Sequence, residues 1–177
     1  MGRSRYKIYK VTHPHFITCT VLHWIPIFTR PETTGIVLDS LKFLQVSDNL
    51  KIYAYVILEN HMHMVVSSDN LPQTIKKFKS FTARQILKVL KAKNVKFILD
   101  QLAFYKKAHK TKSSYQFWQE GSQPKIIQDK EIMIEKVNYI HQNPVKRGYV
   151  NEAKHWRYSS ARDYEGIEGL IAIEKYW

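Results

Sequence analysis

Apolar and polar positions repeat along the chain with two different periods, and these periods predict its strands and helices. Residues 16–23 (FITCTVLH) are rich in β-branched and aromatic side chains and are followed by two prolines, which predicts a strand and then a loop. Residues 33 to about 45 place apolar side chains three and four positions apart, the pattern of an amphipathic helix. Thr33 or Thr34 is the expected N-cap of that helix.

The middle of the chain predicts two further strands and a basic helix. Residues 51–58 (KIYAYVIL) and 63–67 (HMVVS) are short β-rich runs joined by the polar Glu59 and Asn60. We expect them to be adjacent strands, or one bent strand, and both to be central in a sheet. Residues 71–91 return to helical spacing, with many lysines on the side away from the apolar stripe.

The C-terminal half predicts a loop and a last clear helix. Residues 104–123 lack a regular period and indicate a basic loop, in which residues 115–118 could form a short strand. Residues 129–142 predict a helix capped by Asp129 or the residue before it. The step Asn143-Pro144 should end this helix, because a residue before proline avoids the helical conformation.

The order of these elements predicts an α+β fold, in which helices pack on an antiparallel sheet. With 177 residues, of which 44% are hydrophobic, the chain should form one domain over residues 1–177. Within it, residues 1–12 should form a basic arm, although residues 1–10 fit a first strand as readily, and residues 165–177 should form a surface tail. The lone cysteine, Cys19, lies in an apolar run and should be buried as a thiol.

The charge of the chain narrows the classes of partner. Lys and Arg number 28 against 15 Asp and Glu, which gives a net charge of +13 and favours polyanions. A membrane partner is not expected, because no apolar run approaches the roughly 20 residues of a spanning helix. The sequence therefore indicates a nucleic-acid-binding protein of the cytoplasm.

A pair of histidines is the first candidate for chemistry. His61 and His63 flank Met62 at the start of a predicted strand, and strand side chains alternate, so both imidazoles should point to the same face. Two neutral imidazoles suit a divalent metal but leave coordination positions open for a further ligand or a phosphate oxygen. Taken alone, the pair also fits two half-exposed polar residues beside a core.

The last helix offers a nucleophile and a further ligand. Tyr139 and Asn143 are four residues apart and should project from one face of that helix. A phenol with a pKa near ~10 is a poor nucleophile unless a metal or a base assists it. By itself, Tyr139 is better explained by ordinary helix packing.

Four motifs together resemble one known family. They are VILENHMHMVV at 56–66, FWQEG at 117–121, YIHQNPVKRGYV at 139–150 and WRYSSARDY at 156–164. In this combination the chain resembles the REP-associated tyrosine transposases, which belong to the single-tyrosine HUH superfamily of small bacterial transposases. The resemblance runs from about residue 13 to residue 164.

The resemblance implies a fold, a cofactor and roles for single residues. The implied fold is a ferredoxin-like α/β sandwich with the histidine strand at its centre. His61 and His63 would bind Mg²⁺ or Mn²⁺ with help from Asn143, and Tyr139 would attack DNA. The contacts of the basic helix at 71–91 and of the loop 105–112 cannot be carried over, because both look unlike those of the family.

The activity implied is that of a single-stranded DNA endonuclease and strand transferase. Attack by Tyr139 would leave a 5′-phosphotyrosine and free a 3′-hydroxyl, and a second 3′-hydroxyl could reverse the attack and join strands without ATP. The expected substrate is single-stranded or hairpin DNA. The sequence has no phosphate-binding glycine loop, and this reaction needs none.

Cationic and aromatic side chains are candidates for contacts with DNA phosphates and bases. These candidates are Lys76, Lys77, Lys79, Arg84, Lys107, Trp118, Lys146 and Arg147. A solvated lysine face and an aromatic residue in the core are the alternatives. Lys146 and Arg147 directly follow the tyrosine helix and are the best placed to meet DNA near the active site.

Two other functions compete with this one. The chain could be a non-catalytic protein of the same fold that binds hairpin nucleic acid, or a metal-dependent phosphohydrolase that activates water. The sequence leaves open whether the protein is a monomer or a homodimer, and whether the tyrosine serves its own histidines or those of a second copy.

Overall fold

A four-stranded antiparallel sheet forms the centre of the fold. The computed structural model describes residues 13–121 and 124–175, so the basic arm expected at 1–12 lies outside the described residues. The strands are β1 (His15–Thr20), β2 (Lys51–Ile57), β3 (His61–Ser67) and β4 (Lys125–Ile126), in the spatial order β2-β3-β1-β4.

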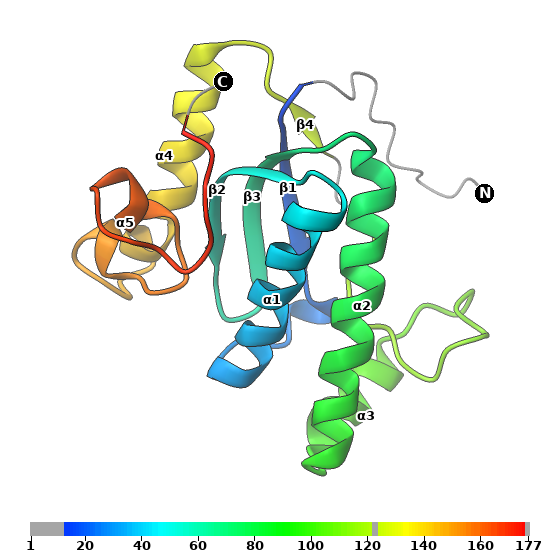
Figure 1. Cartoon of the computed structure of the whole chain (residues 1–177). Helices are drawn as coiled ribbons and strands as arrows, with labels where there is room; N and C mark the ends of the chain where they lie inside the picture. Colours follow the sequence, from blue (N-terminus) through cyan, green and yellow to red (C-terminus); the bar gives the residue numbers. More distant parts are fainter. Residues whose placement is uncertain (1–12, 122–123, 176–177) are drawn as a thin grey trace.

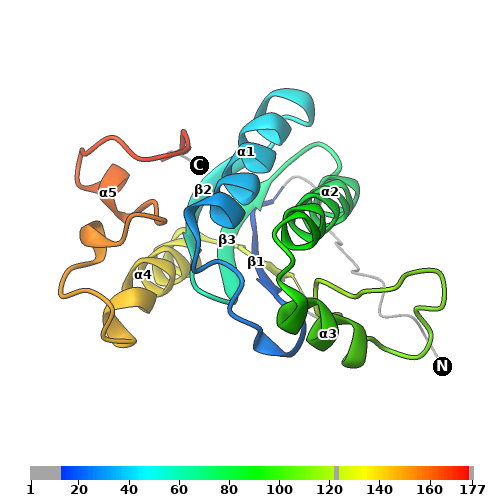
Figure 2. The ribbon, with the colours of Figure 1, turned by 90° about the horizontal axis from the view of Figure 1, so that it is seen from below.

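Helices cover both faces of this sheet. They are α1 (Pro31–Ser47), α2 (Leu71–Ala92), α3 (Lys96–Phe104), α4 (Lys130–Lys146) and α5 (Ala161–Tyr164), with the short 3-10 turns η1 (Leu22–Trp24) and η2 (Ala153–His155). Helices α1 and α2 lie on one face and α4 on the other, as the two views show (Figures 1 and 2). The run β1-α1-β2-β3-α2-β4 with this strand order is the ferredoxin-like arrangement, so the expected α+β fold is confirmed.

The strand β3 separates two hydrophobic cores. All seven of its residues are buried. Its even-numbered side chains, Met62, Met64 and Val66, belong to the large core beneath α1 and α2, whereas Val65 belongs to the smaller core beneath α4. Because strand side chains alternate, the odd-numbered His61 and His63 share the α4 face with Val65.

The strand β2 lies at the edge of the sheet, which corrects the expectation that both middle strands are central. Its outer side is nevertheless covered by a C-terminal segment: the backbone N–H of Ile57 donates to the carbonyl of Tyr158 at 2.8 Å, and that of Ser160 to the carbonyl of Tyr55 at 3.0 Å. All residues of β2 after Lys51 are therefore buried, as in a central strand, because both faces of the strand and its outer edge are covered.

The start of α1 differs from the expectation. The helix begins at Pro31, with Arg30 as an N-cap that makes no side-chain hydrogen bond. The hydroxyls of Thr33 and Thr34 donate instead to carbonyls of the preceding loop, those of Ile27 at 2.6 Å and Phe28 at 3.2 Å. Proline at a first helical position loses no hydrogen bond, so it can start the helix earlier than the threonines suggest.

Helix α4 begins as expected and ends later. Asp129 caps it, with its carboxylate accepting from the backbone N–H of Ile132 at 2.8 Å. The helix does not end at Asn143, because Pro144 lies inside it and the helix runs on to Lys146. Pro144 is buried, so packing offsets the hydrogen bond that its ring nitrogen cannot make.

Two connecting segments were misread from the sequence. The first strand ends at Thr20 rather than residue 23, and the segment 96–104, for which no element was expected, forms α3. Around Trp118 the chain makes only an isolated bridge with Val21, not a strand. Cys19 is buried as expected.

The segment after α5 is packed rather than a surface tail. Ile171 is 3% exposed and joins the core beneath α1 and α2, and the backbone N–H of Glu174 donates to the carbonyl of Ile52 at 2.8 Å.

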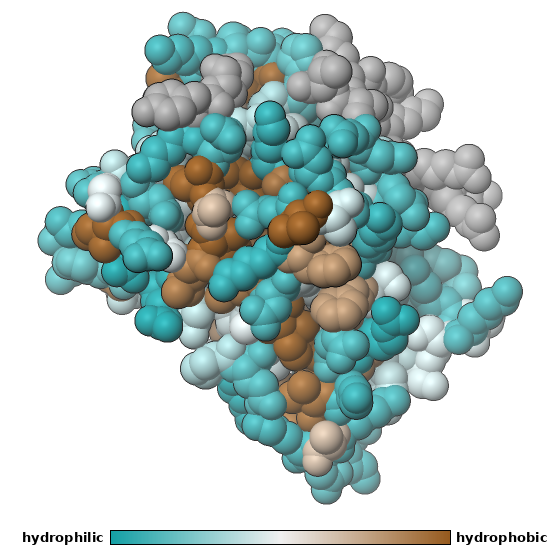
Figure 3. All heavy atoms as spheres, viewed as in Figure 1, coloured by the Kyte–Doolittle hydropathy of each residue, from teal (hydrophilic) through white to brown (hydrophobic). Residues whose placement is uncertain are grey.

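The face formed by α1 and α2 is largely hydrophilic, with hydrophobic patches between the polar side chains (Figure 3). None of the helices in the described residues is long and apolar enough to cross a membrane.

Candidate active site

Two histidine side chains lie together on the α4 face of the sheet. His61 and His63 are 2% and 6% exposed, and the centroids of their rings are 4.9 Å apart in an edge-to-face contact. The ring of Phe16, on the neighbouring strand β1, stacks on His63 at 5.4 Å. The alternation of a central strand therefore places both imidazoles side by side, as the sequence predicted.

A hydrogen bond fixes the tautomer of His61. Its Nδ1 lies 2.6 Å from the side-chain oxygen of Asn60, and the side-chain nitrogen of Asn60 donates to the carbonyl of Trp24 at 3.1 Å. Because the Asn60 oxygen can only accept, Nδ1 of His61 carries the proton and Nε2 holds a free electron pair. Nδ1 of His63 lies 2.8 Å from the hydroxyl of Thr18, which allows the same tautomer there.

Both imidazoles are held in the neutral form. Burial, followed by the nearby positive charge of Arg147, lowers the pKa of His61 to about 4, although Glu59 acts in the opposite direction. Burial, then His61 and Arg147, lowers the pKa of His63 to about 3. At neutral pH the two rings are therefore uncharged and can act as ligands.

Tyr139 projects from α4 toward the histidines. The centroid of its ring is 5.3 Å from that of His63 and 5.8 Å from that of Phe16, in edge-to-face contacts. The side chain is 43% exposed, so the phenol stays open to solvent and to a substrate. The structure thus brings the predicted nucleophile and the predicted histidines together within one chain.

Asn143 lies one turn after Tyr139 and is 9% exposed. Its side-chain nitrogen donates to the backbone carbonyl of Tyr139 at 3.3 Å. This bond orients the amide and leaves its oxygen without a hydrogen-bond partner among the described residues. Both residues lie within α4, so their spacing of four places Asn143 on the face of Tyr139.

Comparison with known proteins addresses the family. No protein-family model matches the chain. Over 111 residues, which are 60% of this chain and 56% of the relative, the chain is 31% identical to a Haemophilus influenzae protein described as "Putative REP-associated tyrosine transposase". Over this region the chain is similar to the REP-associated tyrosine transposases. It spans about half the length of the curated relative that it matches.

A solved structure supports the same assignment at the level of the fold. A REP-associated tyrosine transposase bound to a REP hairpin superposes with a TM-score of 0.66 and 18% identity, over 100% of this chain and 94% of that chain. At this identity the likeness shows the fold alone.

The donor atoms fit a metal site built from mixed ligands. Among residues 13–121 and 124–175, no group of three or more His, Cys, Asp or Glu side chains is arranged to hold a metal ion. The chain offers instead three donor atoms of mixed kind. They are Nε2 of His61, Nε2 of His63 and the amide oxygen of Asn143. Imidazole nitrogen and amide oxygen are ordinary ligands of divalent cations.

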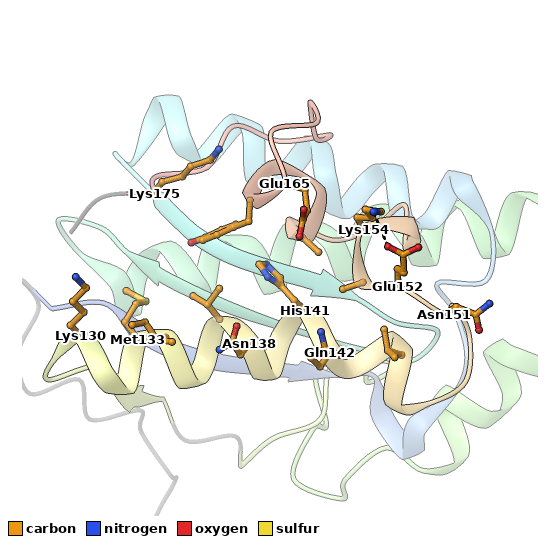
Figure 4. A pocket seen from close by; sticks show the side chains of 16 residues that line it. Lys130, Met133, Asn138, His141, Gln142, Asn151, Glu152, Lys154, Glu165 and Lys175 are labelled. Carbon is orange, nitrogen blue, oxygen red and sulfur yellow. Dashed lines mark ion pairs between the residues drawn. The ribbon is translucent and has the colours of Figure 1, made fainter.

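Helix α4 is anchored from its other side by His141. Nε2 of this buried ring lies 2.9 Å from the hydroxyl of Ser160, which accepts the backbone N–H of Tyr55 at 2.9 Å. Figure 4 shows His141 pointing away from α4 toward the C-terminal segment, where its ring meets that of Tyr164 at 4.9 Å. The groove of about 650 Å³ along this side of α4 is separate from Tyr139.

A basic groove lies on the opposite face of the molecule. It has a volume of about 900 Å³, runs between α2 and the segment 110–120, and contains two of the predicted DNA contacts, Lys79 and Arg84. Trp118 forms part of its wall but is 7% exposed, and its indole N–H donates to the hydroxyl of Thr82 at 3.1 Å. This burial speaks against base stacking by Trp118 and favours the alternative of a core residue.

The remaining predicted contacts have other surroundings. Lys76 is exposed on α2, whereas Lys77 forms an ion pair with Asp48 at 2.9 Å. Lys107 lies 3.5 Å from Glu120, and Lys146 is exposed near the end of α4.

Arg147 follows Lys146 at the C-cap of α4 and pairs with Glu59 at 3.2 Å. The sequence did not point to Glu59, which pairs with Arg147. It also did not point to Asn60, which bonds to the ring of His61, or to Thr18, which bonds to the ring of His63. The adjacency of Asn60 to His61 was the available signal, whereas Thr18 is brought there only by strand pairing.

The low histidine pKa values predict a loss of stability in mild acid. In the unfolded chain each histidine titrates near pH ~6.5, whereas burial lowers the pKa of His61, His63 and His141 to about 4, 3 and 4. Between pH 6.5 and 5 the unfolded state therefore binds protons that the folded state does not, and the free energy of unfolding should fall as the pH falls.

Urea unfolding at pH 7, 6 and 5, where most carboxylates stay ionised, measures this slope. His141→Gln should reduce it by up to about 1.4 kcal/mol per pH unit, since it removes one such group. An unfolding free energy that does not change between pH 7 and 5 would contradict the prediction.

Proposed function

We propose that this protein is a metal-dependent single-stranded DNA endonuclease and strand transferase, which acts on hairpin DNA through a covalent link to Tyr139. The observation that carries the proposal is the contact of the Tyr139 ring with His63, at 5.3 Å between centroids, on a face where both histidines are neutral. The relationship to the REP-associated tyrosine transposases supports it, as does the net charge of +13.

His61, His63 and Asn143 would hold a Mg²⁺ or Mn²⁺ ion. A bound divalent cation would polarise the scissile phosphate and offset the charge that develops on it. The chain prepares the ligands: hydrogen bonds to Nδ1 leave Nε2 of both rings available, and the bond from Asn143 to the Tyr139 carbonyl orients the amide.

The step proposed for Tyr139 is a transesterification. Its phenolic oxygen forms a bond to the phosphorus, and the bond from phosphorus to the 3′-oxygen breaks. The phenol proton passes to water, to which the 43% exposed side chain is open, and the leaving 3′-oxygen takes a proton from water. The products are a 5′-phosphotyrosine and a 3′-hydroxyl. Because one phosphate ester replaces another, a second 3′-hydroxyl can reverse the attack and join strands without ATP.

A single copy of the chain supplies the tyrosine and the histidines. Helix α4 packs against its own sheet through Met133, Val137 and Ile140, and His141 ties it to the C-terminal segment. This arrangement supports an active site that is complete in a monomer.

DNA binding is proposed for two surfaces. The end of α4, with Lys146 and Arg147, lies next to the active site, while the groove on the α2 face carries Lys79, Arg84, Lys88, Lys91 and Lys112 against one acidic residue, Glu120. A structural relative was solved with a REP hairpin, which supports hairpin DNA as the partner. Phosphate contacts of this kind give affinity with little dependence on base sequence.

Replacing the tyrosine tests the chemistry directly. Tyr139→Phe should abolish covalent attachment to an end-labelled hairpin oligonucleotide in Mn²⁺ or Mg²⁺, because it removes the attacking oxygen, while binding stays within about threefold. Tyr149→Phe is the matched control, since Tyr149 is 44% exposed just beyond α4, and it should form the adduct normally. A labelled protein band on a denaturing gel is the readout.

Two outcomes would contradict the proposal in different ways. An adduct at full yield in Tyr139→Phe would remove Tyr139 from the role. Hairpin binding without any adduct in the unmodified protein would point to a non-catalytic binding protein, and repeated turnover without an adduct to a phosphohydrolase.

The hydrogen bond to His63 should matter for metal affinity. Thr18→Val replaces the hydroxyl that contacts Nδ1 with a methyl group of similar size, so the affinity for Mn²⁺ should fall about 10- to 100-fold. Thr20→Val on the same strand is the control, because Thr20 makes no hydrogen bond to either histidine ring, and it should change the affinity less than about twofold. Titration calorimetry with Mn²⁺ distinguishes the two variants, and equal affinities would disprove the role of Thr18.

If the basic groove binds DNA phosphates, part of the affinity for hairpin DNA should depend on the salt concentration. Arg84→Ala combined with Lys88→Ala should weaken hairpin binding and reduce the slope of log affinity against log salt by about 1.4 to 1.8, since each phosphate contact contributes about 0.7 to 0.9. Lys51→Ala with Lys154→Ala removes the same charge far from the groove and should leave the slope nearly unchanged. Equal slopes for both pairs in a fluorescence anisotropy titration would exclude the groove.

A further inference from the structure

An ion pair joins the two elements that carry the proposed active site. Arg147 is the C-cap of α4, and Glu59 lies in the turn between β2 and β3, two residues before His61. Nη1 of Arg147 donates to Oε1 of Glu59 at 3.2 Å. The second carboxylate oxygen, Oε2 of Glu59, is buried and has no hydrogen-bond partner among the described residues.

The position of Arg147 follows from the helix. Tyr139, Asn143 and Arg147 are spaced by four residues, so they follow one another along one side of α4. The backbone N–H of Arg147 donates to the carbonyl of Asn143 at 3.2 Å, which continues the helical pattern to its end. The positive charge of Arg147 lies close enough to lower the pKa of both His61 and His63.

The guanidinium of Arg147 uses only some of its N–H donors in hydrogen bonds to other side chains of the described residues. An arginine has five N–H donors in a planar fork, and Glu59 is the single side-chain partner of Arg147 within residues 13–121 and 124–175. The side chain is 36% exposed, so the other donors face solvent. Two such donors match the spacing of two oxygens of a phosphodiester, which lysine cannot reproduce.

The burial of one carboxylate oxygen of Glu59 indicates the role of this residue. Leaving a carboxylate oxygen buried without a hydrogen bond is unfavourable, so Glu59 is maintained at a cost to stability. A flexible arginine would lose several rotamers on binding a phosphate, and an ion pair with Glu59 removes much of that freedom beforehand. Glu59 itself presents little charge to DNA, because its oxygens are paired with Arg147 or buried.

We propose that Arg147 is a catalytic residue, which binds the non-bridging oxygens of the scissile phosphate and offsets their growing negative charge, and that Glu59 is a positioning residue, which holds the guanidinium beside the histidine pair. This inference rests on the proposed function, because it assigns a group to the same phosphoryl transfer. Arg147 transfers no proton and no electron in this role.

The experiment separates catalysis from DNA binding. The rate constant of adduct formation is measured in a single turnover, with hairpin DNA in saturating excess, for the full chain and its variants. Arg147→Ala should lower this rate constant about 100- to 1,000-fold, the effect of removing one preorganised donor to a developing charge. Lys51→Ala removes an exposed cation at the other end of β2, opposite Ser67 in the sheet, and should leave the saturated rate constant within about twofold.

Chemical rescue with a free guanidinium compound distinguishes a guanidinium that acts on the substrate from a structural tie, which only holds α4 to the turn between β2 and β3. Methylguanidinium added to Arg147→Ala should restore the rate about tenfold or more, whereas Arg147→Lys, which keeps the charge but loses the fork, should stay impaired. Glu59→Gln keeps the shape of the carboxylate without its charge and should lower the rate constant about tenfold. In the Glu59→Gln/Arg147→Ala double variant, a given rescue should require more methylguanidinium than in Arg147→Ala alone.

Each result decides one point. An unmodified protein that forms the adduct, together with an Arg147→Ala variant whose saturated rate is unchanged, overturns the role of Arg147 and leaves the proposed function in place. Loss of the rate without rescue in a variant that is folded by circular dichroism makes Arg147 a structural tie. No adduct in the unmodified protein overturns both proposals.

Discussion

The placing of α4 depends on the backbone hydrogen bonds that close the outer edge of β2. Ile57 and Tyr55 bind residues 158 and 160 of a segment far along the chain, and Ser160 in turn contacts His141 on α4. An unpaired edge would leave donors and acceptors of β2 in need of a partner, and the segment supplies them. Because Tyr139 and Asn143 occupy the other side of the same helix, these bonds and the packing of Met133, Val137 and Ile140 on the sheet together hold Tyr139 beside His63.

Much of this architecture could be predicted from local sequence patterns. The His61 and His63 pair shares a face because alternation in a buried strand leaves no other choice, and the spacing of Tyr139 and Asn143 is a property of any helix. What joined these two pieces was the resemblance of the motifs to a family, because no local pattern tells which face of a sheet a distant helix covers. Thr18 escaped notice for the same reason, since it meets His63 only through the pairing of β1 with β3.

The corrections share a physical cause, which is that tertiary packing overrides local preference. Pro144 should have ended α4, but it is buried and the helix continues. Residues 96–104, for which no element was expected, form α3 with Leu99 and Leu102 in the core. Trp118 looked available for stacking on bases, yet its indole is held inside the fold by Thr82.

The sheet has a consequence for how such a protein can change over time. It stands between the basic groove on the α2 face and the tyrosine on the α4 face, so the two surfaces share no side chains. Substitutions in the groove can therefore change the charge of that surface without disturbing the histidine pair or Tyr139. Under the proposed function, recognition and reaction could drift at separate rates, each under its own selection, within one small domain.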